Sequence, residues 1–246
     1  MYSLTKLELS AMTALGSTLR GFGKDASSME EVANRIVSCL YDTFRESEHE
    51  PSCQLIRLFR TMRLSDLEPE VQAFAEALMP DQRLEGDTRC LTLLATRGSQ
   101  PQWNSRRDSV GHQAIPLPSS ETIDSIPMIS QLIAQLGIDV ASVVKPDPEL
   151  VLETEQTTYN VFFVENAKES AFIPAKEDFV DAYDIASVLG CGGLLPSGEM
   201  FALLMFSQHR IERATADMFR NAAMNIKLAL LPFDDACIFA GRKDEQ

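Results

Sequence analysis

The chain has 246 residues, 45% of them hydrophobic, and a formal net charge of −14 that arises from 36 acidic and 22 basic side chains. This length and composition allow one large domain or two small ones with a substantial core. The acidic surplus disfavours nucleic acid and anionic membranes as partners. No stretch approaches eighteen consecutive apolar residues, and no basic segment precedes an apolar one at the N-terminus, so neither a membrane span nor secretion is expected.

The cysteines favour a reducing compartment. There are five, all far apart in the sequence, and none forms the Cys-x-x-Cys spacing of a metal site. An odd number of cysteines scattered through apolar stretches is typical of reduced, buried thiols. We therefore expect a cytoplasmic protein, and we expect these five thiols to be buried: Cys39, Cys53, Cys90, Cys191 and Cys237.

The first hundred residues predict helices followed by strands. Apolar residues at three- and four-residue steps predict a helix over residues 3–19 and another over 29–44. The second helix follows two overlapping capping boxes, Ser27 with Glu30 and Ser28 with Glu31. A strand is expected over 53–59, a short helix with Pro69 in its first turn over 67–78, and a second strand over 90–96.

The middle of the chain is less regular. Residues 99–124 are rich in Pro, Ser, Gln and Arg, and a connection this long inside a compact domain is usually functional or disordered. A helix is then expected over 127–136, ended by Gly137. Strands are expected over 140–144 and 159–164, followed by a short helix over 175–183.

The last third predicts a β-hairpin and a terminal helix. Two apolar runs, residues 185–195 and 200–206, flank a turn that contains Pro196 and Gly198. An amphipathic run then reaches Leu230 and is expected to pack across the hairpin. The whole order of elements predicts an α+β fold, with a central antiparallel sheet and helices on its faces. Regular strand–helix alternation, which a doubly wound parallel sheet needs, is missing.

These elements resemble a GAF domain, a small-molecule-sensing relative of PAS domains. The matching features are Ser187-Val188-Leu189, the Gly198-Glu199 turn, the strand over 201–206 and the helix over 213–230, in that order. The resemblance covers residues 25–232 as a single sensory domain, after an N-terminal helix within residues 1–24 and before a tail over 233–246. Gly192-Gly193 stands where GAF sequences commonly have Pro. The residue sets of cyclic-nucleotide-binding and bilin-binding members are not recognisable, so neither ligand is supported.

The resemblance implies a non-catalytic bacterial sensor in the cytoplasm, with a ligand pocket on one sheet face that is covered by residues 103–183. The terminal helices of such domains commonly form a homodimer bundle and signal to an output domain or partner protein. The alternative for both helices is burial in their own core. Because the chain ends soon after Pro232, an output domain is expected either beyond this fragment or on a separate partner. No cofactor is identified.

Several residues are candidates for ligand binding. Trp103 beside Arg106 and Arg107 suits a planar or anionic ligand, by stacking and bidentate bonds, although exposed loop charges are the commoner reading. His112 suits an acid/base role or haem ligation. The set we consider is Trp103, Arg106, Arg107, His112, Tyr159, Phe162 and Cys191. We expect no catalytic residues and no metal site. The alternatives are a dimerisation scaffold whose pocket is filled, and a small hydrolase or transferase that uses His112 with Asp108.

Overall fold

The fold is built on one six-stranded antiparallel sheet with the strand order β5-β4-β3-β8-β7-β6. The computed structural model describes residues 1–149, 159–235 and 237–239. The expected α+β architecture is confirmed. The strands are β3 (Cys53–Arg63), β4 (Arg89–Gly98), β5 (Ala114–Leu117), β6 (Val161–Val164), β7 (Ser187–Leu194) and β8 (Met200–Ser207), and a separate pair is β1 (Arg45–Ser47) with β2 (Glu50–Pro51).

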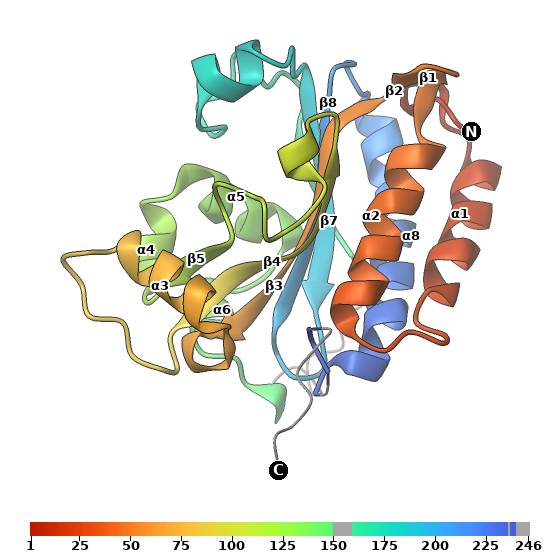
Figure 1. Cartoon of the computed structure of the whole chain (residues 1–246). Coiled ribbons are helices and arrows are strands. Elements are labelled where there is room, and N and C mark those ends of the chain that lie inside the picture. Colours follow the sequence, from red (N-terminus) through yellow and green to blue (C-terminus); the bar gives the residue numbers. More distant parts are fainter. Residues whose placement is uncertain (150–158, 236, 240–246) are drawn as a thin grey trace.

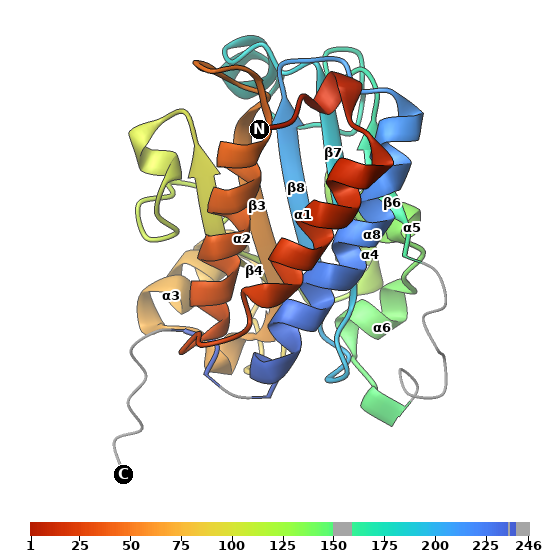
Figure 2. The ribbon, with the colours of Figure 1, turned by 90° about the vertical axis from the view of Figure 1, so that its right-hand side faces the viewer.

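Three long helices cover one face of the sheet (Figures 1 and 2). They are α1 (Leu9–Gly21), α2 (Met29–Thr43) and α8 (Arg213–Leu230). Each places an apolar stripe against the sheet or a neighbouring helix, and these side chains form one core. We call this side the helix face. The buried side chains of α1 belong to this core, so its apolar stripe packs against α8 within the same chain.

Shorter elements cover the opposite face, which we call the pocket face (Figure 1). A second apolar core lies here, separated from the first by the sheet. The short elements of this face are α4 (Ser120–Asp124), α5 (Pro127–Leu136), α6 (Val140–Val144), the 3₁₀ turn η3 (Pro101–Trp103) and the π-helix η4 (Lys176–Asp181). The α3 helix (Pro69–Ala77) lies beside β5 at the edge of the sheet. Its buried side chains belong to the helix-face core, as do those of the 3₁₀ turns η1 (Leu4–Lys6), η2 (Leu64–Asp66) and η5 (Leu231–Phe233).

The two cores explain why the central strands are apolar along their whole length. All eight residues of β8 are buried, and successive side chains go to opposite faces. Leu203 and Met205 enter the helix-face core, whereas Leu204 and Phe206 enter the pocket-face core. A strand buried on both sides has no polar face, which is why the hairpin shows continuous apolar runs.

Local signals place several boundaries where we expected them. The Ser28 hydroxyl accepts a hydrogen bond from the Glu31 amide and caps α2. Gly137, at φ 73°, ends α5 in the left-handed conformation. Gly198, at φ 83°, lies in the β7–β8 turn, and α8 packs against β7 as predicted.

Two predictions about local structure were wrong. Residues 140–144 form a helix, because the Asp139 side chain accepts a hydrogen bond from the Ser142 amide and this cap outweighs the strand preference of a Val-rich run. The stretch 99–124 is not an unstructured loop, since it contains η3, β5 and α4. β5 tolerates Pro116 because it is an edge strand, whose outer side needs no ladder hydrogen bond.

The cysteine prediction is confirmed in part. All five thiols are free; Cys53, Cys90 and Cys191 are buried, whereas Cys39 is only half-buried. Cys237 is exposed, contrary to the prediction, because it lies beyond η5 in the segment that follows the last helix. Of the expected tail over 233–246, residues 236 and 240–246 lie outside the described residues.

Candidate functional site

A cavity of about 220 Å³ lies on the pocket face, at the position where we expected a ligand site. Its floor is the sheet, through β3, β4 and β8, and its cover comes from α5, η3 and the start of η4. Most of its wall is aliphatic or aromatic, which is typical of a small-molecule pocket. The apolar wall includes Leu55, Phe59, Trp103, Ile129, Leu132, Phe179, Leu204 and Phe206.

A cluster of aromatic rings forms one side of this cavity. The rings of Trp103 and Tyr183 lie 4.6 Å apart between centroids, and those of Phe179 and Phe206 lie 5.1 Å apart, both edge-to-face. Phe179 also contacts Trp103 at 5.8 Å. Such edge-to-face pairs are worth about 0.5–1.5 kcal/mol each beyond their area burial. The cluster therefore fixes η3 and η4 against the sheet and gives the cavity a defined wall.

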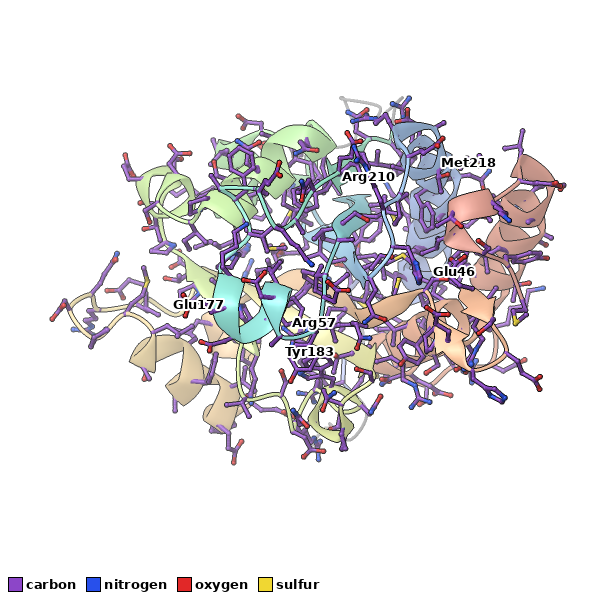
Figure 3. All side chains as sticks on the ribbon, turned by 90° about the horizontal axis from the view of Figure 1, so that it is seen from above. Glu46, Arg57, Glu177, Tyr183, Arg210 and Met218 are labelled. Carbon is purple, nitrogen blue, oxygen red and sulfur yellow. The ribbon has the colours of Figure 1, made fainter. Side chains whose placement is uncertain are left out.

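Arg57 is the charged side chain of the cavity wall. It stands on β3 between Leu55 and Phe59, and therefore on the same face of the strand as these two apolar residues. Nη2 donates to Ser109 Oγ at 3.3 Å, and the buried Nε has no hydrogen-bond partner. Burial lowers the pKa of Arg57 to about 10. Figure 3, a view from above, labels Arg57 together with Tyr183 and Glu177 in the same part of the picture.

His112 is the second polar side chain that lines the cavity. It adopts a left-handed backbone conformation at φ 63°, which is uncommon for a residue other than Gly, Asn or Asp. Part of the side chain is exposed, so the imidazole stands at the mouth. Burial of the remainder, together with the charge of Arg57, lowers the pKa of His112 below its usual value of 6.5. The imidazole is therefore neutral at pH 7.

A third polar group lies beside Arg57. Thr96 on β4 is the cross-strand partner of Arg57, so the two side chains are on the same face. Thr96 is 2% exposed, and its hydroxyl oxygen has no hydrogen-bond partner. Buried hydroxyls are usually bonded, so an unbonded one next to an unbonded guanidinium nitrogen needs an explanation.

Of the candidate residues predicted from the sequence, the structure brings Trp103 and His112 together at this cavity. Arg106 and Arg107 line a separate groove of about 420 Å³ beside α3. There, Arg106 bonds to Glu30 at 2.7 Å and, through two nitrogens, to Glu68 at 3.1 and 3.2 Å. The charge of Arg106 is thus already balanced by carboxylates of its own chain.

The other three candidates do not line the cavity. Phe162 is fully buried in the pocket-face core behind it, and Tyr159 packs against the helix-face core. Cys191 points into the helix-face core, and burial raises its pKa to about 12. A thiol with this pKa stays protonated and unreactive at pH 7.

The sequence did not single out Arg57, yet it held a signal for this residue. In the run Leu55-Ile56-Arg57-Leu58-Phe59, the period of two places a charge on the same face as two large apolar side chains. A charge at an inward strand position is unusual and indicates either a buried ion pair or a ligand contact. Phe179 and Phe206 had no comparable signal, because a core role explains both equally well.

The hydrolase alternative receives no geometric support. Asp108 is exposed, whereas His112 lines the cavity, and no hydrogen bond or ion pair joins the two side chains. Within the described part of the chain, no group of three or more His, Cys, Asp or Glu side chains is arranged to hold a metal ion.

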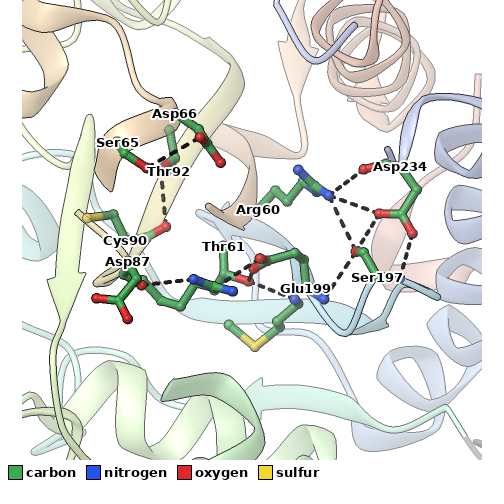
Figure 4. Close-up of polar contacts among 12 residues, drawn as sticks. Arg60, Thr61, Ser65, Asp66, Asp87, Cys90, Thr92, Ser197, Glu199 and Asp234 are labelled. Atoms are coloured by element: carbon green, nitrogen blue, oxygen red, sulfur yellow. Dashed lines mark hydrogen bonds and ion pairs between the residues drawn. The ribbon is translucent and has the colours of Figure 1, made fainter. Parts of the chain in front are cut away.

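A second feature is an ionic cluster at the end of the sheet, beside a cleft of about 700 Å³ (Figure 4). Nη2 of Arg60 lies 2.9 Å from Oδ1 of Asp234, whose carboxylate also accepts bonds from the hydroxyl and amide of Ser197. Nε of Arg89 lies 2.9 Å from Glu199. These charges are paired with one another, so the cluster is explained as a structural connection between β3, the β7–β8 turn and the segment after α8.

The Glu199 carboxylate has two partners, one of which is held in turn by the backbone. The Thr61 hydroxyl donates to its carboxylate at 2.6 Å, Arg89 pairs with it, and the Met200 amide in turn donates to Thr61. Burial raises the pKa of Glu199 despite these partners. This carboxylate therefore belongs to the hydrogen-bonded connection between β3 and β8.

Comparison with known protein families and with characterised proteins finds no match to this chain. None of the helices in residues 1–149, 159–235 and 237–239 combines the length and apolar character needed to cross a membrane.

Proposed function

We propose that this protein is a GAF-like sensory or regulatory domain that binds a small molecule in the 220 Å³ cavity and has no catalytic activity of its own. The observation that carries the proposal is the cavity itself, a largely apolar space on one face of an antiparallel sheet, with Arg57 in its wall and His112 at its mouth. The free thiols support a cytoplasmic location.

The position of the terminal helices supports a signalling role. α1 and α8 pack against each other on the helix face, and the sheet alone separates them from the cavity. β3 and β8 contribute side chains to both cores, so a ligand that shifts these strands also shifts the surface on which α8 lies. A homodimer through these helices is part of the proposal, and the exposed apolar side chains of Leu9 and Met224 on α1 and α8 are suited to it.

Ligand-dependent thermal stabilisation tests the proposal, because a ligand that binds only the native state raises its stability by mass action. A library of small acids, amides, nucleotides and haem is screened against the wild-type protein and against Met128→Trp. Met128 lies on α5 and lines the cavity, so the larger side chain is expected to fill it. Ala134→Trp adds the same ring on the exposed side of α5 and serves as the control.

The expected result is a compound that stabilises the wild type and Ala134→Trp but not Met128→Trp. If no compound raises the melting temperature, or if Met128→Trp responds like the control, the sensor proposal fails. The dimerisation scaffold with a filled pocket then becomes the better account.

A further inference from the structure

We infer that the ligand of this cavity is a small organic monoanion, with an apolar body about the size of one ring and a single carboxylate that binds Arg57. The inference rests on the proposed function and adds the chemical class of the ligand. It is carried by an arginine that lines a largely apolar cavity and has no acidic partner among the described residues.

The three arginines whose side chains are buried show what is missing at the half-buried Arg57. Arg60 pairs with Asp234, Arg89 with Glu199, and Arg106 with Glu30 and Glu68. Arg97 is half-buried like Arg57, but its guanidinium lies over the Tyr41 ring and does not line the cavity. Among the described residues, no carboxylate pairs with Arg57, whose one hydrogen bond is to the neutral hydroxyl of Ser109.

A cation held in apolar surroundings without a counter-ion is unfavourable. An anionic ligand would remove this penalty on binding. The cavity therefore selects for negative charge.

The groups around Arg57 define how such an anion is held. A guanidinium presents parallel N–H donors that match the two oxygens of a carboxylate. The unbonded Thr96 hydroxyl lies directly across the strand pair from Arg57, outside the cavity lining, and offers a further donor to a group that binds Arg57. His112 adds a neutral imidazole at the mouth and no second positive charge. One cation with neutral donors beside it suits a ligand with one negative charge.

The size of the cavity limits the rest of the ligand. A cavity of about 150 Å³ holds a benzene molecule, and this one is about 220 Å³. One ring with a short acidic substituent, or an aliphatic chain of similar bulk, therefore fills it. The aromatic wall of Trp103, Phe179 and Phe206 favours a ring, which these side chains contact edge-to-face or by offset stacking.

The test uses matched pairs of probes that differ in charge alone. Benzoate, phenylacetate and hexanoate are compared with benzamide, phenylacetamide and hexanamide, with affinities measured by calorimetry on the wild-type protein, Arg57→Met and Arg57→Lys. At least one acid is expected to bind at least tenfold more tightly than its amide. Arg57→Met should remove this preference, whereas Arg57→Lys should retain part of it.

A second variant keeps the test decisive if Arg57→Met does not fold. Thr96→Val removes the unbonded hydroxyl at nearly constant volume and is expected to weaken binding of the acids several-fold while leaving the amides unchanged. Retention of full acid affinity in Thr96→Val and in Arg57→Lys would overturn the inference.

Failure of the inference differs from failure of the proposed function. The monoanion inference is overturned, and the sensor proposal stands, if amides bind as tightly as the corresponding acids. The same holds if no acid binds but neutral library compounds do, and Met128→Trp abolishes their binding. Absence of binding by every compound, charged or neutral, overturns the sensor as well.

Discussion

Asp234→Ala provides the sharpest test of how this fold is held together. Oδ1 of Asp234 lies 2.9 Å from Arg60 and 2.7 Å from the Ser197 hydroxyl, and Oδ2 accepts from the Ser197 amide at 2.8 Å. The side chains of the pair are only 6% and 5% exposed. The substitution leaves the Arg60 charge buried with one strong acceptor, the backbone carbonyl of residue 234 at 2.7 Å.

The expected loss is large because the penalty comes from the charge that remains. Removing one partner of a buried ion pair costs about 3–5 kcal/mol. For chains of about 150–250 residues, each kcal/mol lowers the melting temperature by about 2–4 °C. Asp234→Ala is therefore expected to lower the melting temperature by roughly 6–20 °C.

Urea unfolding and calorimetry measure this loss, and an exposed pair provides the control. Arg210 and Glu165 form an ion pair whose side chains are 73% and 55% exposed, so Glu165→Ala should cost at most about 1 kcal/mol. The double substitution Arg60→Met with Asp234→Ala removes both charges and should recover most of the stability. An Asp234→Ala loss no larger than that of Glu165→Ala would refute the reasoning, because Arg60 would then be hydrated.

Three further changes test individual features of the fold. Burial lowers the pKa of His112, so the imidazole binds a proton more readily in the unfolded chain than in the folded one. The free energy of unfolding should therefore fall as the pH drops from about 6.5 through the folded pKa. His112→Asn suits the positive φ, and this variant should show a smaller fall in urea titrations between pH 7 and 5. A Cβ at Gly192 would lie 2.3 Å from the Phe201 carbonyl oxygen, so Gly192→Ala should cost about 1–3 kcal/mol in chemical unfolding, whereas Gly111→Ala, with no atom near its Cβ, should be close to neutral. Ser28→Ala removes the cap of α2 and should cost about 1 kcal/mol in the same assay; a neutral result would mean that water replaces the cap.

Regular elements were predictable because each has a local cause. The amphipathic stripe of α8 and the cap of α2 act over three to five residues, so they are visible in the sequence. β5 was missed because it is four residues long and contains Pro116, which the sheet accepts only at an edge. Whether a strand lies at an edge depends on its partners, and a single sequence does not show them.

The distinction between local signals and tertiary contacts also explains which candidate site residues were predicted correctly. Trp103 and His112 attracted attention because they stand out within an irregular stretch, and both line the cavity. Arg106 attracted attention for the same reason, yet it pairs with Glu30 and Glu68, which precede it by 76 and 38 residues. The sequence thus showed which positions carry a charged side chain that could bind a ligand. Only the tertiary fold shows which of them remain unpaired.

The glycines of β7 link this cavity to the close packing of the sheet. Gly192 and Gly190 lie on the pocket face, where Leu136 and Leu204 occupy the space that side chains would take. Strand pairing continues without a bulge through both positions, so the glycines provide close approach and not a break in the ladder. The α5 helix therefore packs directly on β7, so the part of the cavity cover that α5 forms cannot move closer to the sheet.

In the proposed sensor, transmission from the cavity to the terminal helices would depend on β8. Leu204 lines the cavity, whereas its neighbours Leu203 and Met205 pack in the core beneath α8. Close-packed cores do not absorb a strand shift by compression, so a displacement of β8 must be matched on the helix face. Because α5 packs against β7, the proposed ligand would be accommodated either by movement of the cover formed by η3 and η4 or by movement of β3 and β8. The aromatic cluster ties that cover to Phe206 on β8, and both responses therefore converge on the strand that supports α8.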